Sequence, residues 1–104
     1  MKVNFDDIEI GNVDAGGGNM YYYNDEPFSG TIVEYNAEGV LIGEISVLNG
    51  SSHGKSVLYY DNGQKMEELF QSYSRPYGIF RKWDENGNLI KEIDFGPEYQ
   101  PEKR

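Results

Sequence analysis

The sequence predicts an all-β fold: an open antiparallel meander of about seven to eight strands, built from 24-residue β-hairpin repeats. Two observations support this prediction. Four sets of residues recur every 24 positions, and no segment of ten or more residues places apolar side chains at helical spacing. A fixed interval of this length is typical of repeat proteins, whose units pack against their neighbours. The sets are Gly30, Gly54 and Gly78; Gly39, Gly63 and Gly87; Tyr35, Tyr59 and Trp83; and Glu44, Glu68 and Glu92.

Residues 1–29 are expected to form a degenerate or capping N-terminal unit, because the 24-residue phase fades before residue 20. Partial alternation over residues 2–10 predicts one or two short strands, and Met20–Tyr23 predicts another. The triple glycine Gly16-Gly17-Gly18 predicts a loop with high backbone freedom. A phosphate-binding loop is disfavoured, since no Lys-Ser/Thr pair and no strand-to-helix context follows.

Three full units follow, at residues 30–53, 54–77 and 78–99, within a single domain of residues 1–104. Each contains a four-residue turn whose glycine falls at the left-handed position of a type I turn with a G1 bulge. The connections at 49–53 and 72–77 are rich in turn-forming residues and are expected to be looser. Residues 100–104 are expected to be a frayed tail.

Composition and charge limit the possible partners. The net charge of −9 disfavours binding to nucleic acid or to an anionic membrane and favours a basic protein partner, although a merely solvated surface is the alternative. The chain has no cysteine, so no disulfide, thiolate nucleophile or zinc–cysteine site is expected. Neither the apolar run of a secretory signal nor a stretch of ~18 apolar residues is present, so a cytoplasmic protein is expected.

The repeated glutamates are candidate binding residues. Equivalent strands of a meander lie roughly 9–10 Å apart, so Glu44, Glu68 and Glu92 are expected to form a row on one face, where they can meet a basic partner. Alternatively, they pair with bases of this chain such as Lys91 or Arg81, or are solvated. That spacing falls outside the range of paired glycosidase carboxylates, about 5–9.5 Å, so an acid–base enzyme is not indicated.

Aromatic residues form a second candidate set. Tyr35, Tyr59 and Trp83 can bind a sugar or peptide, or can simply be the hydrophobic face of the sheet. Glu34 is included because an exposed aromatic side chain beside acids makes a protein-binding patch. His53, the only histidine, lies in a predicted turn where nothing positions a catalytic triad, and no metal or cofactor site is expected.

The units resemble the variant MORN repeat of bacterial proteins. The third unit is the nearest to the pattern; the second has Lys65 where leucine is usual, and the first has Glu38 where asparagine is expected. The resemblance covers roughly residues 20–96 and implies a sheet of stacked hairpins. It also implies frequent occurrence as antitoxin or immunity proteins, and no catalytic residue maps onto this chain. The matching positions of the third unit are Gly78, Phe80, Trp83, Asn86, Gly87, Leu89 and Glu92.

The sequence therefore favours a non-catalytic antitoxin or immunity protein that blocks a bacterial toxin, such as a basic nuclease, through an acidic and aromatic sheet face. The alternative is a MORN-repeat scaffold or a glycan- or peptide-binding module that uses the aromatic face. The oligomeric state stays open, because a meander has edge strands that can pair with another chain. The candidate partner-binding residues are Glu34, Glu44, Glu68, Glu92, Tyr35, Tyr59 and Trp83.

Overall fold

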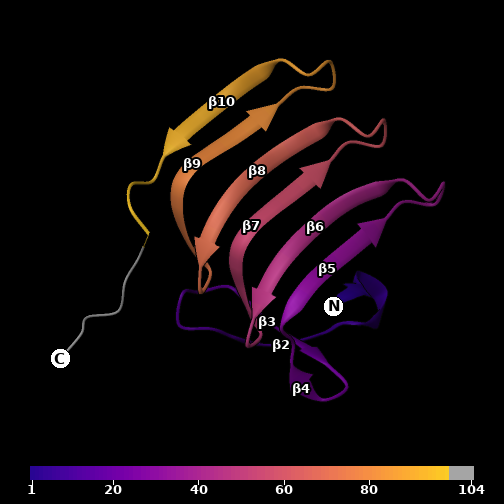
Figure 1. Cartoon of the computed structure of the whole chain (residues 1–104), viewed down its shortest axis with the longest axis vertical. Helices are drawn as coiled ribbons and strands as arrows, with labels where there is room; N and C mark the ends of the chain where they lie inside the picture. The colour runs from indigo at the N-terminus through magenta and orange to yellow at the C-terminus, as the bar shows by residue number, and fades with distance from the viewer. Residues whose placement is uncertain (99–104) are drawn as a thin grey trace.

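The computed structural model describes residues 1–98, which form ten strands and one short 3-10 helix (Figure 1). The predicted tail at 100–104 lies outside the described residues. No helix in the described part of the chain is long and apolar enough to cross a membrane. The elements are β1 (Lys2–Asn4), the 3-10 helix (Phe5–Asp7), β2 (Glu9–Val13), β3 (Asn19–Tyr23), β4 (Glu26–Pro27), β5 (Gly30–Tyr35), β6 (Leu41–Leu48), β7 (Ser51–Tyr59), β8 (Lys65–Ser72), β9 (Arg75–Trp83) and β10 (Leu89–Asp94).

The predicted all-β meander is confirmed. Strands β5 to β10 follow one another in a sheet in which every neighbouring pair is antiparallel. One strand departs from the pattern: β1 extends this sheet to seven strands by pairing with β5 in the parallel direction. A parallel neighbour needs a long crossover, which the N-terminal segment supplies. Strands β2, β3 and β4 in that segment form a separate three-stranded sheet.

The predicted hairpin turns are also confirmed. Gly39, Gly63 and Gly87 have φ values of 81°, 86° and 87°, in the left-handed region that glycine adopts most cheaply. The N–H of each donates to the carbonyl of the first turn residue, at 2.9–3.1 Å. These turns lie along one border of the sheet, which we call the turn edge (Figure 1). They set the register of each hairpin.

The triple glycine belongs to a fourth turn of the same kind. Gly17 has a φ of 89°, and its N–H donates to the carbonyl of Asp14 at 3.0 Å. The Asp14 carboxylate accepts hydrogen bonds from the N–H groups of Gly16 and Gly18, at 3.0 and 2.9 Å. Gly17 precedes Gly39 by 22 positions rather than 24, so a search at fixed phase misses it. A hydrogen-bonded hairpin turn, not a loop with high backbone freedom, therefore joins β2 and β3.

The prediction of looser connections at 49–53 and 72–77 is wrong. Only Asn49-Gly50 and Tyr73-Ser74 are turn residues, and all four have positive φ, as a type I′ turn requires. Of the remaining residues, Ser72 ends β8, and the others begin β7 and β9, which are nine residues long each. Ser51 and Ser52 were misleading because serine is common in turns; here they are buried strand residues facing the N-terminal unit.

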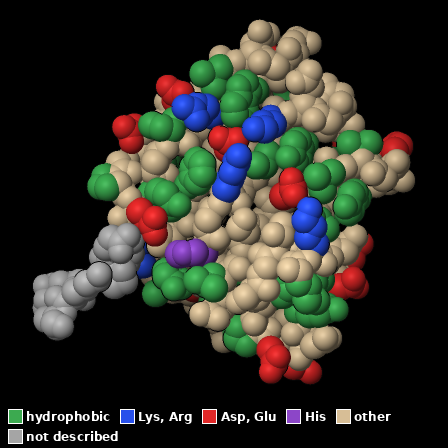
Figure 2. Space-filling view, viewed as in Figure 1, with side chains coloured by type: hydrophobic (Ala, Val, Ile, Leu, Met, Phe, Trp, Pro, Cys, Tyr) green, Lys and Arg blue, Asp and Glu red, His purple; other side chains and the backbone are tan. Residues whose placement is uncertain are grey.

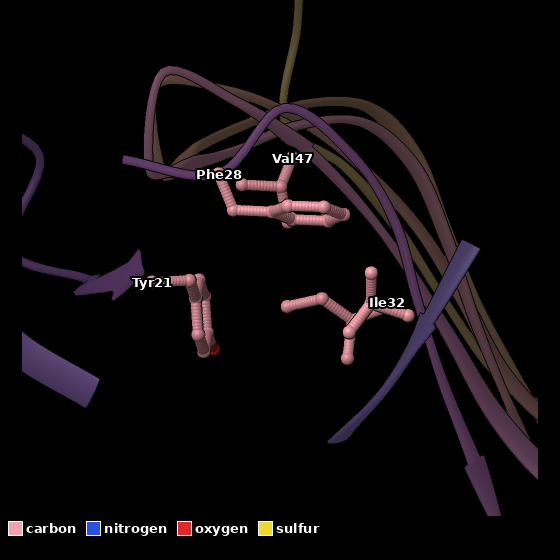
Figure 3. Close-up of a cluster of buried hydrophobic side chains, with 5 residues drawn as sticks. Tyr21, Phe28, Ile32 and Val47 are labelled. Carbon is pink, nitrogen blue, oxygen red and sulfur yellow. The ribbon is translucent and has the colours of Figure 1, made fainter. Parts of the chain in front are cut away.

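The core lies where the N-terminal unit packs on one face of the sheet. It contains Val3, Tyr21, Phe28, Ile32 and Val47. Figure 3 shows Tyr21 reaching from β3 toward the sheet, with Phe28, Ile32 and Val47 around the same space. Ile32 is 1 % exposed, so the tightest packing is at the β5 end of the sheet. The hairpins farther along contribute partly exposed side chains and depend more on main-chain pairing.

We expect Asp14→Ala to destabilise the protein by about 1–3 kcal/mol, because it leaves donors of the N-terminal turn unpaired. The Ser74 hydroxyl also donates to this carboxylate, so the substitution loosens the turn from the β8–β9 connection. Urea denaturation measures the change. Asp7→Ala, at an exposed position, is the matched control; equal stability of the two variants would contradict the assignment.

Candidate partner-binding surface

The register of the sheet brings the three repeated glutamates onto one face. Directly opposed residues of neighbouring strands point to the same side, and one such row contains Glu44, Glu68 and Glu92. The intervening positions of the row are Val33, Val57 and Arg81. We call this side of the sheet the ladder face. The N-terminal unit covers part of the other side, the opposite face, which carries Ile32 and Ile45.

The predicted aromatic residues share the ladder face, because they lie two positions along their strands from residues of the glutamate row. The Tyr59 hydroxyl donates to Glu44 Oε1 at 3.1 Å, and Lys65 Nζ lies 5.8 Å from the centre of the Trp83 ring. Burial, together with the Glu44 carboxylate, raises the pKa of Tyr59. Tyr35 is the most open of the three, at 49 % exposed. The aromatic row is thus partly engaged within the protein.

Each glutamate of the row pairs with a base of this chain. Glu68, only 8 % exposed, meets Lys65 at 2.9 Å and Lys55 at 3.4 Å. The hydrogen bond from Lys65 lowers the pKa of Glu68, and Lys55 adds to the effect although burial opposes it. Internal pairing, one of the alternatives that the sequence left open, is therefore what the structure contains.

The other two pairs are more exposed. Arg81 Nε lies 3.0 Å from Glu92, which identifies one of the bases considered from the sequence. Lys2 Nζ lies 3.8 Å from Glu44. Lys91, the other base considered, is opposite Lys82 in the register and so points to the opposite face. Lys55 and Lys65 were not anticipated as partners, because only the register reveals that they converge on Glu68.

These pairs change where the negative charge lies. The chain has 18 acidic and nine basic residues, of which three acids and four bases join ion pairs on the ladder face. Fifteen acids and five bases are left for the rest of the chain. Figure 2 shows Lys and Arg side chains lying among Asp and Glu side chains across the sheet. The ladder face is therefore mixed in charge, and the acidic excess lies elsewhere.

Glu34 is on the other side of the sheet from the other six predicted residues. It is opposite Gly43 in the register, one position from the glutamate row, and so it points to the opposite face. There it borders a hollow of about 330 Å³, which Tyr59 also borders. Apart from Glu34 and Tyr59, sequence reasoning missed the residues of this hollow, because its lining comes from four hairpin strands and a turn. The other lining residues are Ile42, Leu58, Tyr59, Tyr60, Asp61 and Met66.

The turn edge adds further acids that were not predicted as site residues. Glu38, Asp61 and Glu85 are exposed there, and none of the three four-residue turns contains a Lys or Arg. The backbone N–H of Asn88 donates to Asp84, and this hydrogen bond lowers the pKa of the Asp84 carboxyl. The recurrence of acids in successive turns was the available sequence signal. The hollow and the turn edge together form an apolar floor with an acidic border.

The described residues, 1–98, give little support for a metal site or for a catalytic role of His53. They contain no group of three or more His, Cys, Asp or Glu side chains placed to hold a metal ion. His53 Nδ1 accepts a hydrogen bond from the N–H of Tyr73 at 3.2 Å, and the two rings lie 4.6 Å apart. His53 thus holds the β8–β9 turn, a structural role within the sheet.

Comparison with known proteins supports the repeat assignment. The family model for the MORN repeat variant matches residues 52–71 and 76–95. The matched segments correspond to the β7–β8 and β9–β10 hairpins. No curated protein and no solved structure matches the chain. The β7–β8 and β9–β10 hairpins are therefore similar to the MORN repeat variant, and the chain has the architecture of a repeat module.

We expect Glu68→Gln to lower the free energy of unfolding by about 1–2 kcal/mol at pH 7, because it removes charge-assisted hydrogen bonds from a nearly buried position. The folded-state pKa of Glu68 is below its ordinary value of 4.5, so this stabilisation is present above about pH 4.5 and is lost as the pH falls through the folded-state pKa. Denaturation of both proteins between pH 7 and pH 3 should show the difference shrinking with acidity. A difference independent of pH would contradict the ion-pair explanation.

Proposed function

We propose that this chain is a protein-binding repeat module that acts as an antitoxin or immunity protein. It binds a basic bacterial toxin in the cytoplasm and blocks it by occlusion, without catalysis of its own. One observation carries the proposal: two exposed acids, Glu34 and Asp61, border an apolar hollow on the opposite face, and neither forms an ion pair among residues 1–98. The match to the MORN repeat variant is a second support.

The proposed contact surface combines two physical terms. Ile42, Leu58 and Met66 provide partly exposed apolar area that a partner can bury. Glu34 and Asp61 beside them are exposed and attract a basic partner, which speeds association and disfavours acidic competitors. Within residues 1–98, neither Glu34 nor Asp61 forms an ion pair, so a basic side chain of the partner can dock there without displacing a described base.

The ladder face suits this role less well. Glu68 is nearly buried and already held by two lysines, so a partner would have to break these contacts before using its charge. We therefore assign the proposed electrostatic contact to Glu34 and the turn edge rather than to the glutamate row.

A matched pair of charge reversals tests the proposal. Glu34→Lys/Asp61→Lys changes the proposed surface, whereas Glu9→Lys/Glu26→Lys makes the same charge change at exposed positions of β2 and β4. Wild type and both variants are immobilised, and a lysate of the source organism is passed over each. We expect a basic protein to bind wild type and control but to bind Glu34→Lys/Asp61→Lys at least tenfold more weakly, with a strong dependence on salt.

The captured protein is then expressed alone and together with this chain. Growth arrest by the partner alone, relieved by wild type and less by Glu34→Lys/Asp61→Lys, is the expected result. A partner that is harmless to the cell, or equal binding by the two variants, would overturn the proposal.

A glycan- or peptide-binding scaffold is the second candidate. Its support is the exposure of Tyr35 and a polar hollow of about 270 Å³ on the ladder face beside Tyr59, Lys55 and Glu44. If this function is correct, Tyr35→Ala and Trp83→Ala should abolish binding of an immobilised glycan, whereas Glu34→Lys/Asp61→Lys should retain glycan binding. Binding of the same glycan after both aromatic substitutions would exclude it.

A further inference from the structure

The two ends of the seven-stranded sheet differ. At one end, β1 is three residues long, contains the buried Val3 and runs directly into the 3-10 helix. At the other end, β10 spans Leu89–Asp94 and, among the described residues, pairs only with β9. Every residue of β10 except Ile93 is exposed, and Ile90 is 57 % exposed. One side of β10 therefore presents main-chain groups without a strand partner in the described part of the chain.

Strand β10 is the third member of a series. Strands β6, β8 and β10 each follow a type I turn with a G1 bulge and pair with the preceding strand. Both β6 and β8 accept a further antiparallel strand on their other side, namely β7 and β9. The same backbone arrangement thus accepts a strand twice within this protein, so the outer side of β10 is shaped to accept a third.

The side chains of β10 specify what such a strand should carry. Glu92, on the ladder face, has Arg81 on its inner side and no base on its outer side among the described residues. Lys91, on the opposite face, lies directly opposite Lys82, a like-charge contact that a neighbouring acid would relieve. The complementary strand therefore has a base opposite Glu92, an acid opposite Lys91 and an apolar residue opposite Ile93.

A second copy of this chain fits poorly. Two copies could pair through antiparallel β10 strands related by a two-fold axis. For the ladder faces of both copies to lie on the same side, this axis must pass through a residue position, so that the residue is opposite its own copy. Centring on Lys91 or Glu92 opposes two like charges, and centring on Ile93 opposes Glu92 with the Asp94 of the second copy. With the axis at Ile90, only the three residues 89–91 of each strand are paired, and this is the segment where the β9–β10 ladder is bulged. The charges of β10 thus disfavour self-pairing while favouring a different strand.

We propose that β10 is a strand-addition site, which takes an extended segment of the partner protein with adjacent basic and acidic residues between apolar ones. This inference rests on the proposed function for the identity of the partner, since it assigns the segment to the toxin. Main-chain hydrogen bonds supply general affinity, and the charges at Lys91 and Glu92 select the register.

Two blocked peptides of equal composition test the site on the full chain. The matched peptide, Thr-Val-Arg-Glu-Val-Thr, places its Arg opposite Glu92 and its Glu opposite Lys91 in antiparallel pairing. The swapped peptide, Thr-Val-Glu-Arg-Val-Thr, opposes like charges at both positions. Amide exchange and chemical-shift titration by NMR report binding. We expect the matched peptide to protect the amides of β10 and to bind about tenfold more tightly than the swapped one.

The double variant Lys91→Glu/Glu92→Lys should reverse this preference, with spectra of β5 to β7 unchanged as evidence of an intact fold. A matched peptide N-methylated on its β10-facing residues should fail to bind. Equal binding of both peptides, binding of the N-methylated peptide, absence of protection at β10, or dimerisation through β10 without peptide would each overturn the proposal.

The captured partner separates this inference from the proposed function. Loss of partner binding by Lys91→Glu/Glu92→Lys supports strand addition. If that variant binds the partner normally while Glu34→Lys/Asp61→Lys does not, the assignment of β10 to the toxin fails and the proposed function stands. If no form of the protein captures a toxin, the proposed function fails, and the peptide titrations decide whether β10 accepts a strand.

Discussion

The register of main-chain hydrogen bonds between successive hairpins is the constraint on which the rest of this structure depends. Side chains alternate between the two faces of a strand, so a slip of one residue would move every side chain of a strand to the other face. The turns ending at Gly39, Gly63 and Gly87 hold that register through left-handed glycines. Because all three keep it, Glu44, Glu68 and Glu92 fall in one row, and so do the aromatic residues beside them.

The same register determines the electrostatics of the surface. It brings Lys55 from β7 and Lys65 from β8 to the Glu68 carboxylate, and Arg81 from β9 to Glu92. Coulombic attraction at these short distances turns a row of acids into a row of ion pairs. Four bases are used on this face, so the acidic excess lies outside these ion pairs, in the N-terminal unit, at the turn edge and at Glu34 among other places. A chain can therefore be strongly acidic while its most regular acidic motif is neutralised internally.

The N-terminal unit gives the molecule its asymmetry. It repeats the hairpin turn at Asp14 to Gly17 but does not continue the meander; it folds across one face and buries Tyr21 and Phe28 there. A sheet needs a second layer to bury apolar side chains, and this unit supplies the layer from β5 as far as the β8–β9 connection. The β10 end is left with exposed strand residues and an edge that has no strand partner among residues 1–98, so the best-packed part of the sheet and the proposed strand-addition site lie at opposite ends of the sheet.

The sequence by itself determined the all-β class, the hairpin turns and the repeat step, because glycine at left-handed positions and alternating side chains are local requirements. It also placed Glu44, Glu68 and Glu92 on a common face, since their equal spacing requires equivalent positions. Only the tertiary structure decided that Glu34 lies on the other face, that Lys55 and Lys65 neutralise Glu68, and that β1 joins the sheet in parallel. These features depend on register and on contacts between distant segments, and an interval of 24 residues does not encode either.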